Sequence, residues 1–203
     1  MQAPTFKDKE NLIQLLKYLN GTANRGLLFQ AGGTVKPATL VDASYSIHPD
    51  GKSRTGIVIM LAGAAILCMT MKQKLATKSS TESEIVALSD GAVEVLWLME
   101  FLKCQGYDVS GMTIGQDNQS VLTLMSKVRG QSNRTKHLNS RYFFVRDRVL
   151  TGELKLVYVK TEDMVADILT KPLTGFQFHR LTDALLGNKH HGGVLSGDEN
   201  KTK

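Results

Sequence analysis

The chain has 203 residues, of which 42% are hydrophobic and 22% are charged, and this balance excludes global disorder and collagen-like repeats. Its longest apolar run, 57–69, is shorter than the ~18 residues of a membrane span, so we expect a soluble protein with no membrane partner. The two cysteines give neither a disulfide framework nor CxxC spacing, which favours a reducing, intracellular compartment. A formal net charge of +6 favours polyanionic partners such as nucleic acids.

The first 38 residues are expected to form a helix and a strand ahead of the main domain. Leucines at helical spacing predict a helix over 8–19. Asn20–Gly21 would end this helix. The apolar run 26–29 then predicts a short strand.

Three strands and a long helix open the main domain, which we place at residues 39–187. Stretches rich in β-forming residues predict strands over 39–44, 55–61 and 65–71, and the last two are joined as a hairpin. From Ser80 the apolar period becomes helical, which predicts a helix as far as Gln105–Gly106 with Trp97 in the core.

The second half of the domain alternates strands and helices. The pattern predicts strands over 112–117 and 154–159, and helices over 119–127, 135–150 and 164–170. This order is typical of an α/β protein with a mixed five-stranded sheet, in which three antiparallel strands are followed by parallel strands and helices flank the sheet. Residues 188–203 are expected to form a disordered tail.

Four carboxylates fall where an α/β sheet gathers ligands. Asp42 lies within the first strand, Glu84 in the first turn of the long helix, Asp117 at the carboxyl end of a strand, and Asp167 on the last helix. Strand ends and helix starts meet at one edge of such a sheet. Converging carboxylates need cations to offset their repulsion, and hard oxygen ligands favour Mg²⁺ or Mn²⁺. Two such ions would suit in-line displacement at a phosphodiester.

Each acid also has a purely structural alternative. Glu84 lies three residues after Thr81, which is the spacing of a capping box. Asp117 precedes a helix and could cap it in competition with Asn118. The other two acids could cap a turn or lie on a solvated helix face. The four together are much less expected by chance than any one of them.

Five stretches of the chain carry a family resemblance. They are Val41–Tyr45, Lys78–Ser89, Gln116–Ser120, Arg134–Tyr142 and Thr161–Leu173. In this order they resemble the ribonuclease H domain of copia-type retrotransposon polyproteins, which implies a ribonuclease H-like fold from about residue 40 to 186. Residues 15–29 resemble the segment that joins this domain to the reverse transcriptase, so residues 1–38 are expected to be a connection segment.

The resemblance implies hydrolysis of the RNA strand of an RNA–DNA hybrid during reverse transcription. Asp42, Glu84, Asp117 and Asp167 match the catalytic metal ligands of the family. We choose Glu84 over Glu82 because Glu84 stands immediately before the apolar stripe of its helix, as in the family. The reverse transcriptase of the same polyprotein would be a partner, in the cytoplasm, the nucleus or a virus-like particle.

The hypothesised mechanism uses two Mg²⁺ ions, with Mn²⁺ as a substitute. One ion would lower the pKa of the attacking water while the other stabilises the leaving 3′ oxygen, giving a 5′-phosphate and a 3′-hydroxyl. Asp42, on a central strand, is our choice for the ligand that bridges both ions. The loop 159–163 lacks the histidine that cellular ribonucleases H usually carry before the last helix, and this departure bears on turnover rate rather than on reaction type.

A basic ridge on the third helix provides a candidate substrate surface. Arg134, His137, Arg141 and Arg148 share a narrow sector beside an apolar stripe, although solvated Lys and Arg side chains are a common alternative. Contacts to phosphates and 2′-hydroxyls would give affinity without base reading. The expected substrate-binding residues are Ser80, Thr81, Asn118, Gln119, Arg134, Lys136, His137 and Arg141, although those beside the acids could instead cap helices.

Two other functions are alternatives to the nuclease. A catalytically degenerate domain could keep the fold and bind nucleic acid without cleaving it, but all four acids are present. An integrase or transposase nuclease would order its acids Asp, Asp, Glu, whereas this chain has Asp, Glu, Asp, Asp.

Overall fold

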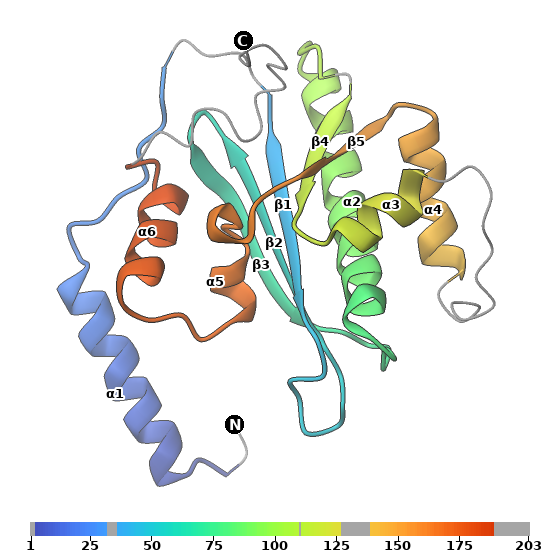
Figure 1. The fold of residues 1–203 in the computed structure, drawn as a ribbon. Helices are drawn as coiled ribbons and strands as arrows, with labels where there is room; N and C mark the ends of the chain where they lie inside the picture. Colours follow the sequence, from blue (N-terminus) through green and yellow to red (C-terminus); the bar gives the residue numbers. More distant parts are fainter. Residues whose placement is uncertain (1–2, 32–35, 110, 127–138, 189–203) are drawn as a thin grey trace.

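The computed structural model describes residues 3–31, 36–109, 111–126 and 139–188. One mixed sheet lies at its centre, with the strand order β3-β2-β1-β4-β5 (Figure 1). Its strands are β1 (Ala38–Ser44), β2 (Arg54–Leu61), β3 (Ala64–Lys72), β4 (Met112–Gln116) and β5 (Leu154–Tyr158). β1, β2 and β3 pair antiparallel, whereas β4 pairs parallel to both β1 and β5. The predicted mixed sheet is therefore confirmed.

Helices cover both faces of this sheet (Figure 1). One face carries α2 (Ser80–Cys104), α3 (Gln119–Ser126) and α4 (Asn139–Leu150), and the other carries α5 (Asp167–Thr170) and α6 (Gly175–Leu185). A 3₁₀ turn at Thr161–Asp163 leads into α5, and α1 (Phe6–Gly21) lies outside α6. None of the described helices is both long and apolar enough to cross a bilayer.

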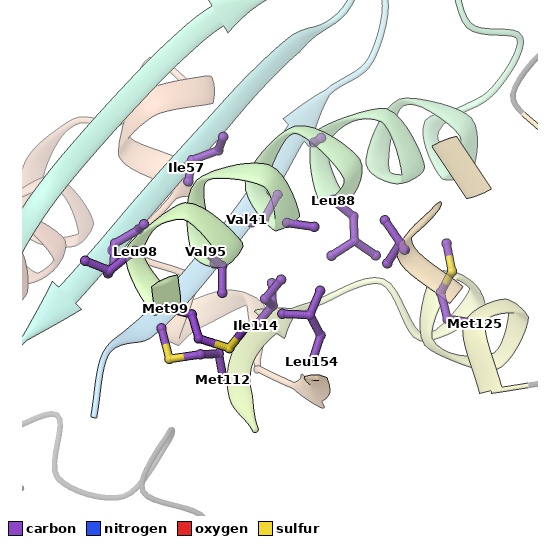
Figure 2. Packing of buried hydrophobic residues seen from close by; sticks show 14 of the residues in the cluster. Val41, Ile57, Leu88, Val95, Leu98, Met99, Met112, Ile114, Met125 and Leu154 are labelled. Atoms are coloured by element: carbon purple, nitrogen blue, oxygen red, sulfur yellow. The ribbon is translucent and has the colours of Figure 1, made fainter. Parts of the chain in front are cut away.

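The central strands supply two cores because their side chains alternate between the faces. Val41 points into the larger core under α2, which Figure 2 shows together with Ile114 and Leu88. Leu40 points into the smaller core formed with α6. Asp42, two residues after Leu40, therefore belongs to the α5 side of the sheet.

Two glycines let helices approach the central strands closely from opposite faces. A Cβ at Gly91 of α2 would lie 2.6 Å from Val41 Cγ2, and a Cβ at Gly56 of β2 would lie 2.7 Å from Thr170 Cγ2. Because Gly56 pairs with Asp42 across the β1–β2 ladder, the absence of a side chain at Gly56 brings α5 against the acid-bearing strand.

The sequence-based prediction of a strand over 26–29 is wrong. These residues form no strand in the structure, and their connections to the domain are isolated backbone hydrogen bonds: Leu28 N donates to Leu186 O and Gln30 N donates to Ala62 O. Two such bonds to different elements do not make a ladder. The prediction of helix α1 is confirmed, but none of its residues is buried.

Trp97 was predicted in the core, and this prediction is also wrong. Its side chain is 66% exposed and stacks on Phe101. The buried stripe of α2 runs through Val95, Leu98 and Leu102, and Trp97 lies about 200° around the helix from Val95. The size and aromatic character of Trp97 favour a core position, but its angle on α2 directs it to solvent.

The end of the domain differs from the single helix predicted over 164–170. Only Asp167–Thr170 is α-helical, and a further helix, α6, follows from Gly175 to Leu185. Residues 135–138 of the third predicted helix and 189–203 of the predicted tail lie outside the described residues. No observation tests the proposed boundary between the connection segment and the domain.

The contact at Gly56 predicts the result of one substitution. Gly56→Ala places a Cβ 3.0 Å from Ala166 O and against Thr170, so we expect the free energy of unfolding to fall by about 1–3 kcal/mol. Gly26→Ala is the control, because a Cβ at Gly26 has no neighbour within 4 Å. Urea unfolding of both variants measures the difference, and equal stability would contradict the close packing of α5.

Candidate active site

The parallel pairing of β1 with β4 brings two acids to the same level. Leu40 lies opposite Gly115 in this register, and Asp42 and Asp117 each come two residues later in the chain. Asp42 is held on a strand buried on both faces, while Asp117 follows the last residue of β4. The strand ends thus present both carboxylates to one point.

The third acid, Glu84, is the fifth residue of α2. Ser79 caps this helix by accepting the Glu82 N–H at its hydroxyl, and the Glu82 carboxylate accepts the Lys78 N–H at 2.7 Å. Glu82 therefore performs the capping that the spacing from Thr81 would have given to Glu84. Glu84, two residues further along the helix, is directed instead toward β1 and β4.

Asp42, Glu84 and Asp117 form a compact group of carboxylates. One oxygen of each lies within 4.8 Å of the others. Asp42 is 1% exposed and Glu84 is 5% exposed, whereas Asp117 is only partly buried. A set of hard oxygen donors at this separation is what Mg²⁺ and Mn²⁺ accept as ligands, so the donor chemistry fits a divalent ion.

Gln116 ties two of these acids together, and sequence reasoning missed it. Its fully buried side chain donates from Nε2 to Glu84 Oε2 at 3.1 Å and accepts the Asp117 N–H at Oε1, at 2.8 Å. The available signal was a buried-strand position with an amide side chain, which must find partners. Gln116 is a positioning residue, since it fixes Glu84 directly and Asp117 through its backbone.

The Asp117 carboxylate is not used to cap α3. Asn118 caps α3 by accepting the N–H groups of Ser120 and Val121, so the helix does not need Asp117 as its cap. Thr161, in the loop that lacks a histidine, donates its hydroxyl to Asp117 Oδ2 at 3.1 Å.

Asp167 lies near this group but is not a member of it. Its carboxylate accepts a hydrogen bond from Lys171 Nζ at 2.7 Å, and the same ammonium lies 3.6 Å from Asp42 Oδ1. Thr170 donates its hydroxyl to Asp42 Oδ2. Thr170 is the last residue of α5 and Lys171 follows it, and sequence reasoning assigned neither of them to the site.

Burial and mutual repulsion perturb the acids strongly. Desolvation, followed by the charge of Asp42, raises the pKa of Glu84 to about 9. The same two causes raise the pKa of Asp117. Desolvation raises the pKa of Asp167 to about 6, although Lys171 opposes the rise. Burial acts to lower the pKa of Lys171, but Asp167 and Asp42 outweigh it and raise that pKa. Without a metal ion, ionising all four acids of the site is therefore unfavourable.

The predicted substrate contacts have mixed positions. Ser80 and Gln119 are exposed, Thr81 is partly buried, and Asn118 is a helix cap. Arg141 forms an ion pair with Asp90 of α2, so it holds α4 against α2. Arg134, Lys136 and His137 lie outside the described residues. No observation tests a substrate contact for any of them.

The sequence is similar to parts of long curated polyproteins. It is 31% identical to the Pol polyprotein of transposon RE1 from Arabidopsis thaliana over 180 residues, covering 87% of this chain. It is 34% identical to that of transposon TNT 1-94 from Nicotiana tabacum over 172 residues. The matched region is only 12% and 13% of the length of these relatives. No family model matches the chain.

The fold is similar to that of solved ribonuclease H domains. The N-terminal RNase H domain of a Mycobacterium tuberculosis protein matches with a TM-score of 0.50 and 16% identity, covering 74% of this chain and 99% of that one. LC11-RNase H1, isolated from compost, matches with a TM-score of 0.50 and 17% identity, covering 67% and 93%. At these identities the likeness concerns the fold.

The raised pKa of Glu84 predicts how stability depends on pH. In the ion-free chain, stability is full below the ordinary value of 4.5 and is lost as pH rises toward about 9. Glu84→Gln removes this loss, so at pH 8 without divalent ions the variant should melt at least about 3 °C above the wild type. Differential scanning calorimetry measures the shift. The exposed Glu100→Gln on the same helix should give none, and equal melting of Glu84→Gln and wild type would contradict the buried repulsion.

Gln73, a second fully buried glutamine, is the control for Gln116. Its Nε2 donates to Thr55 Oγ1 and to the Ser83 carbonyl, and it has no hydrogen bond to a carboxylate among the described residues. Gln116→Met and Gln73→Met should each lower the free energy of unfolding by about 1–3 kcal/mol. Only Gln116→Met should reduce the rise in melting temperature on adding Mg²⁺, because only Gln116 orients the acids. An equal Mg²⁺-induced rise in both variants would contradict this role.

Proposed function

Because homologues of this chain are retrotransposon Pol polyproteins and its fold is that of ribonuclease H domains, we propose that it hydrolyses the RNA strand of RNA–DNA hybrids in a reaction that requires divalent ions. The observation that carries the proposal is the group of three carboxylates at the carboxyl ends of β1 and β4. The resemblance of the surrounding motifs to copia-type ribonuclease H domains supports the hybrid as substrate.

Asp42, Glu84 and Asp117 would hold Mg²⁺, with Mn²⁺ as a substitute. When bound, the ion supplies positive charge at a phosphodiester and lowers the pKa of coordinated water. The protein's contribution is to aim the acids at one point. Desolvation and mutual repulsion raise the pKa values of Glu84 and Asp117 in the ion-free chain, and a bound ion would favour their ionised forms.

The surrounding side chains orient the acids for this task. Gln116 holds Glu84, Thr161 holds Asp117, and Thr170 holds Asp42. Each donor is neutral, so it fixes a carboxylate without neutralising it. Ligands oriented in this way by a second layer of hydrogen bonds bind metals more tightly than ligands that move freely.

The partner and location follow from the polyprotein homology as parts of the same proposal. The reverse transcriptase of the polyprotein would generate the hybrid and deliver it to this site, with residues 1–38 as the connection to it. The reaction would take place inside the cell, in the cytoplasm, the nucleus or a virus-like particle. The basic segment 129–136 would supply phosphate contacts.

Cleavage of a labelled RNA–DNA hybrid in the presence of Mg²⁺ tests this function. Wild type should cleave the RNA strand but neither duplex RNA nor duplex DNA. Asp117→Asn removes one charge from the ion site and should lower the rate by roughly 10²-fold or more. Asp183→Asn, on α6 of the described chain, is the matched control and should keep the wild-type rate.

Two results would contradict the proposal. If a folded wild-type chain binds the hybrid without cleaving it, the protein is the non-catalytic nucleic-acid-binding domain considered above. Full cleavage by Asp117→Asn would separate the activity from the three acids.

A further inference from the structure

The fourth acid, Asp167, pairs with a lysine and does not join the group formed by the other three acids. Lys171 Nζ lies 2.7 Å from Asp167 Oδ1 and 3.6 Å from Asp42 Oδ1. Among the residues the structure describes, Lys171 is the one cation within 4.0 Å of any of the four acids. Asp167 has no oxygen in the compact group formed by Asp42, Glu84 and Asp117. The space between Asp42 and Asp167 therefore already contains a positive charge.

The position of Lys171 is set by the way α5 is fixed to the sheet. Ser44 of β1 donates its hydroxyl to Thr170 O, and Thr70 of β3 donates to Leu169 O. These bonds satisfy the last carbonyls of the helix, while Gly56 permits the close approach. Lys171 is the next residue, and its own N–H donates to Asp167 O at 2.9 Å.

Asp167 and Lys171 flank the single turn of α5. Asp167 opens the helix and Lys171 follows its last residue, so the one turn between them brings the base back beside the acid. Asp167 is 2% exposed, so its charge is costly to bury unless it is paired. The side chain of Lys171 is 36% exposed, with its ammonium turned toward the buried acids.

We propose that Lys171 is the second cation of this site: its ammonium group takes the place of a second divalent ion between Asp42 and Asp167, so the chain binds one divalent ion through Asp42, Glu84 and Asp117. This inference rests on the proposed function, since it concerns the same acids. It differs from the two-ion expectation drawn from the family resemblance. Asp167 is then a positioning residue that holds Lys171 rather than a metal ligand.

The Lys171 ammonium and a second divalent ion exclude each other because both are positively charged. Bringing a divalent ion between Asp42 and Asp167 would put it beside the ammonium, and like charges at such separations repel strongly in a partly buried site. Removing the ammonium without replacing its charge leaves two carboxylates unpaired, and they become free to bind a second ion. An arginine at this position would keep the charge and should keep the single-ion state.

Counting bound Mn²⁺ on the full chain tests the inference without relying on activity. Mn²⁺ is titrated alone, with no nucleic acid, and free ion is measured by electron paramagnetic resonance alongside isothermal titration calorimetry. The variants are Lys171→Gln, Lys171→Arg and the control Lys72→Gln. Lys72 forms a surface ion pair with Asp50 at 2.9 Å, so its substitution changes net charge equally. Circular dichroism melts verify that each variant is folded.

Wild type, Lys171→Arg and Lys72→Gln should each bind one Mn²⁺ per chain. Lys171→Gln should bind a second ion, at least about tenfold more tightly than any second site of the wild type. Asp167→Asn should still bind one Mn²⁺ with an affinity within a few-fold of the wild type. If Asp167 were a metal ligand, its substitution would instead weaken Mn²⁺ binding strongly.

Different outcomes would overturn different statements. Two ions on the wild type, or an unchanged single ion on Lys171→Gln, would overturn the role of Lys171 while leaving the proposed function intact. Loss of the single ion in Asp167→Asn would make Asp167 a ligand and would also overturn the inference. If folded wild type binds no Mn²⁺ and cleaves no hybrid, the proposed function itself fails.

Discussion

The negative charge gathered around Asp42 is the constraint that organises the rest of this structure. A carboxylate 1% exposed on a central strand is stable only if nearby groups donate to it or offset its charge. Two further acids lie beside it, and desolvation followed by repulsion from Asp42 raises the pKa of both. A globular domain without a use for this charge would replace such residues with apolar side chains at little loss. The structure instead surrounds them with donors.

The fold meets this constraint from both faces of the sheet. From one side, α2 approaches β1 closely at Gly91 and presents Glu84, while Gln116 bonds Glu84 to the end of β4. From the other side, α5 approaches β2 at Gly56 and supplies Thr170 and Lys171 to Asp42. Because neutral donors orient the acids and one ammonium offsets part of their charge, the remaining negative charge is left for a divalent ion.

This arrangement links ion binding to folding. An ion that binds the folded chain and not the unfolded one stabilises the fold by mass action, and here it also relieves repulsion that the ion-free chain must tolerate. Glu84 is the acid most affected, because it is both deeply buried and next to Asp42. The folded chain is thus less stable with the site empty than with an ion bound.

Much of the fold, and the meeting of Asp42, Glu84 and Asp117 in one group, could be predicted from the sequence for physical reasons. Local periodicity identified the strands of the sheet and the long helix, and the resemblance of five motifs located Asp42, Glu84 and Asp117. Tertiary contacts could not be found this way. Lys171 and Gln116 act through neighbours distant in sequence, and nothing in their local pattern distinguishes them from an ordinary surface lysine or a strand amide.

The errors have the same origin. Trp97 was assigned to the core by residue type, although its angle on α2 directs it to solvent. Residues 26–29 have strand-like composition, but no strand within the described residues pairs with them. The ion pair of Lys171 with Asp167, and its closeness to Asp42, depend on the tertiary fold and have no signal in the local sequence.

Anomalous diffraction from crystals of the chain soaked in Mn²⁺ tests the central claim most directly. We expect a strong peak at coordination distance, about 2 Å, from carboxylate oxygens of Asp42, Glu84 and Asp117. A map with no peak among these three side chains at saturating Mn²⁺ would contradict it.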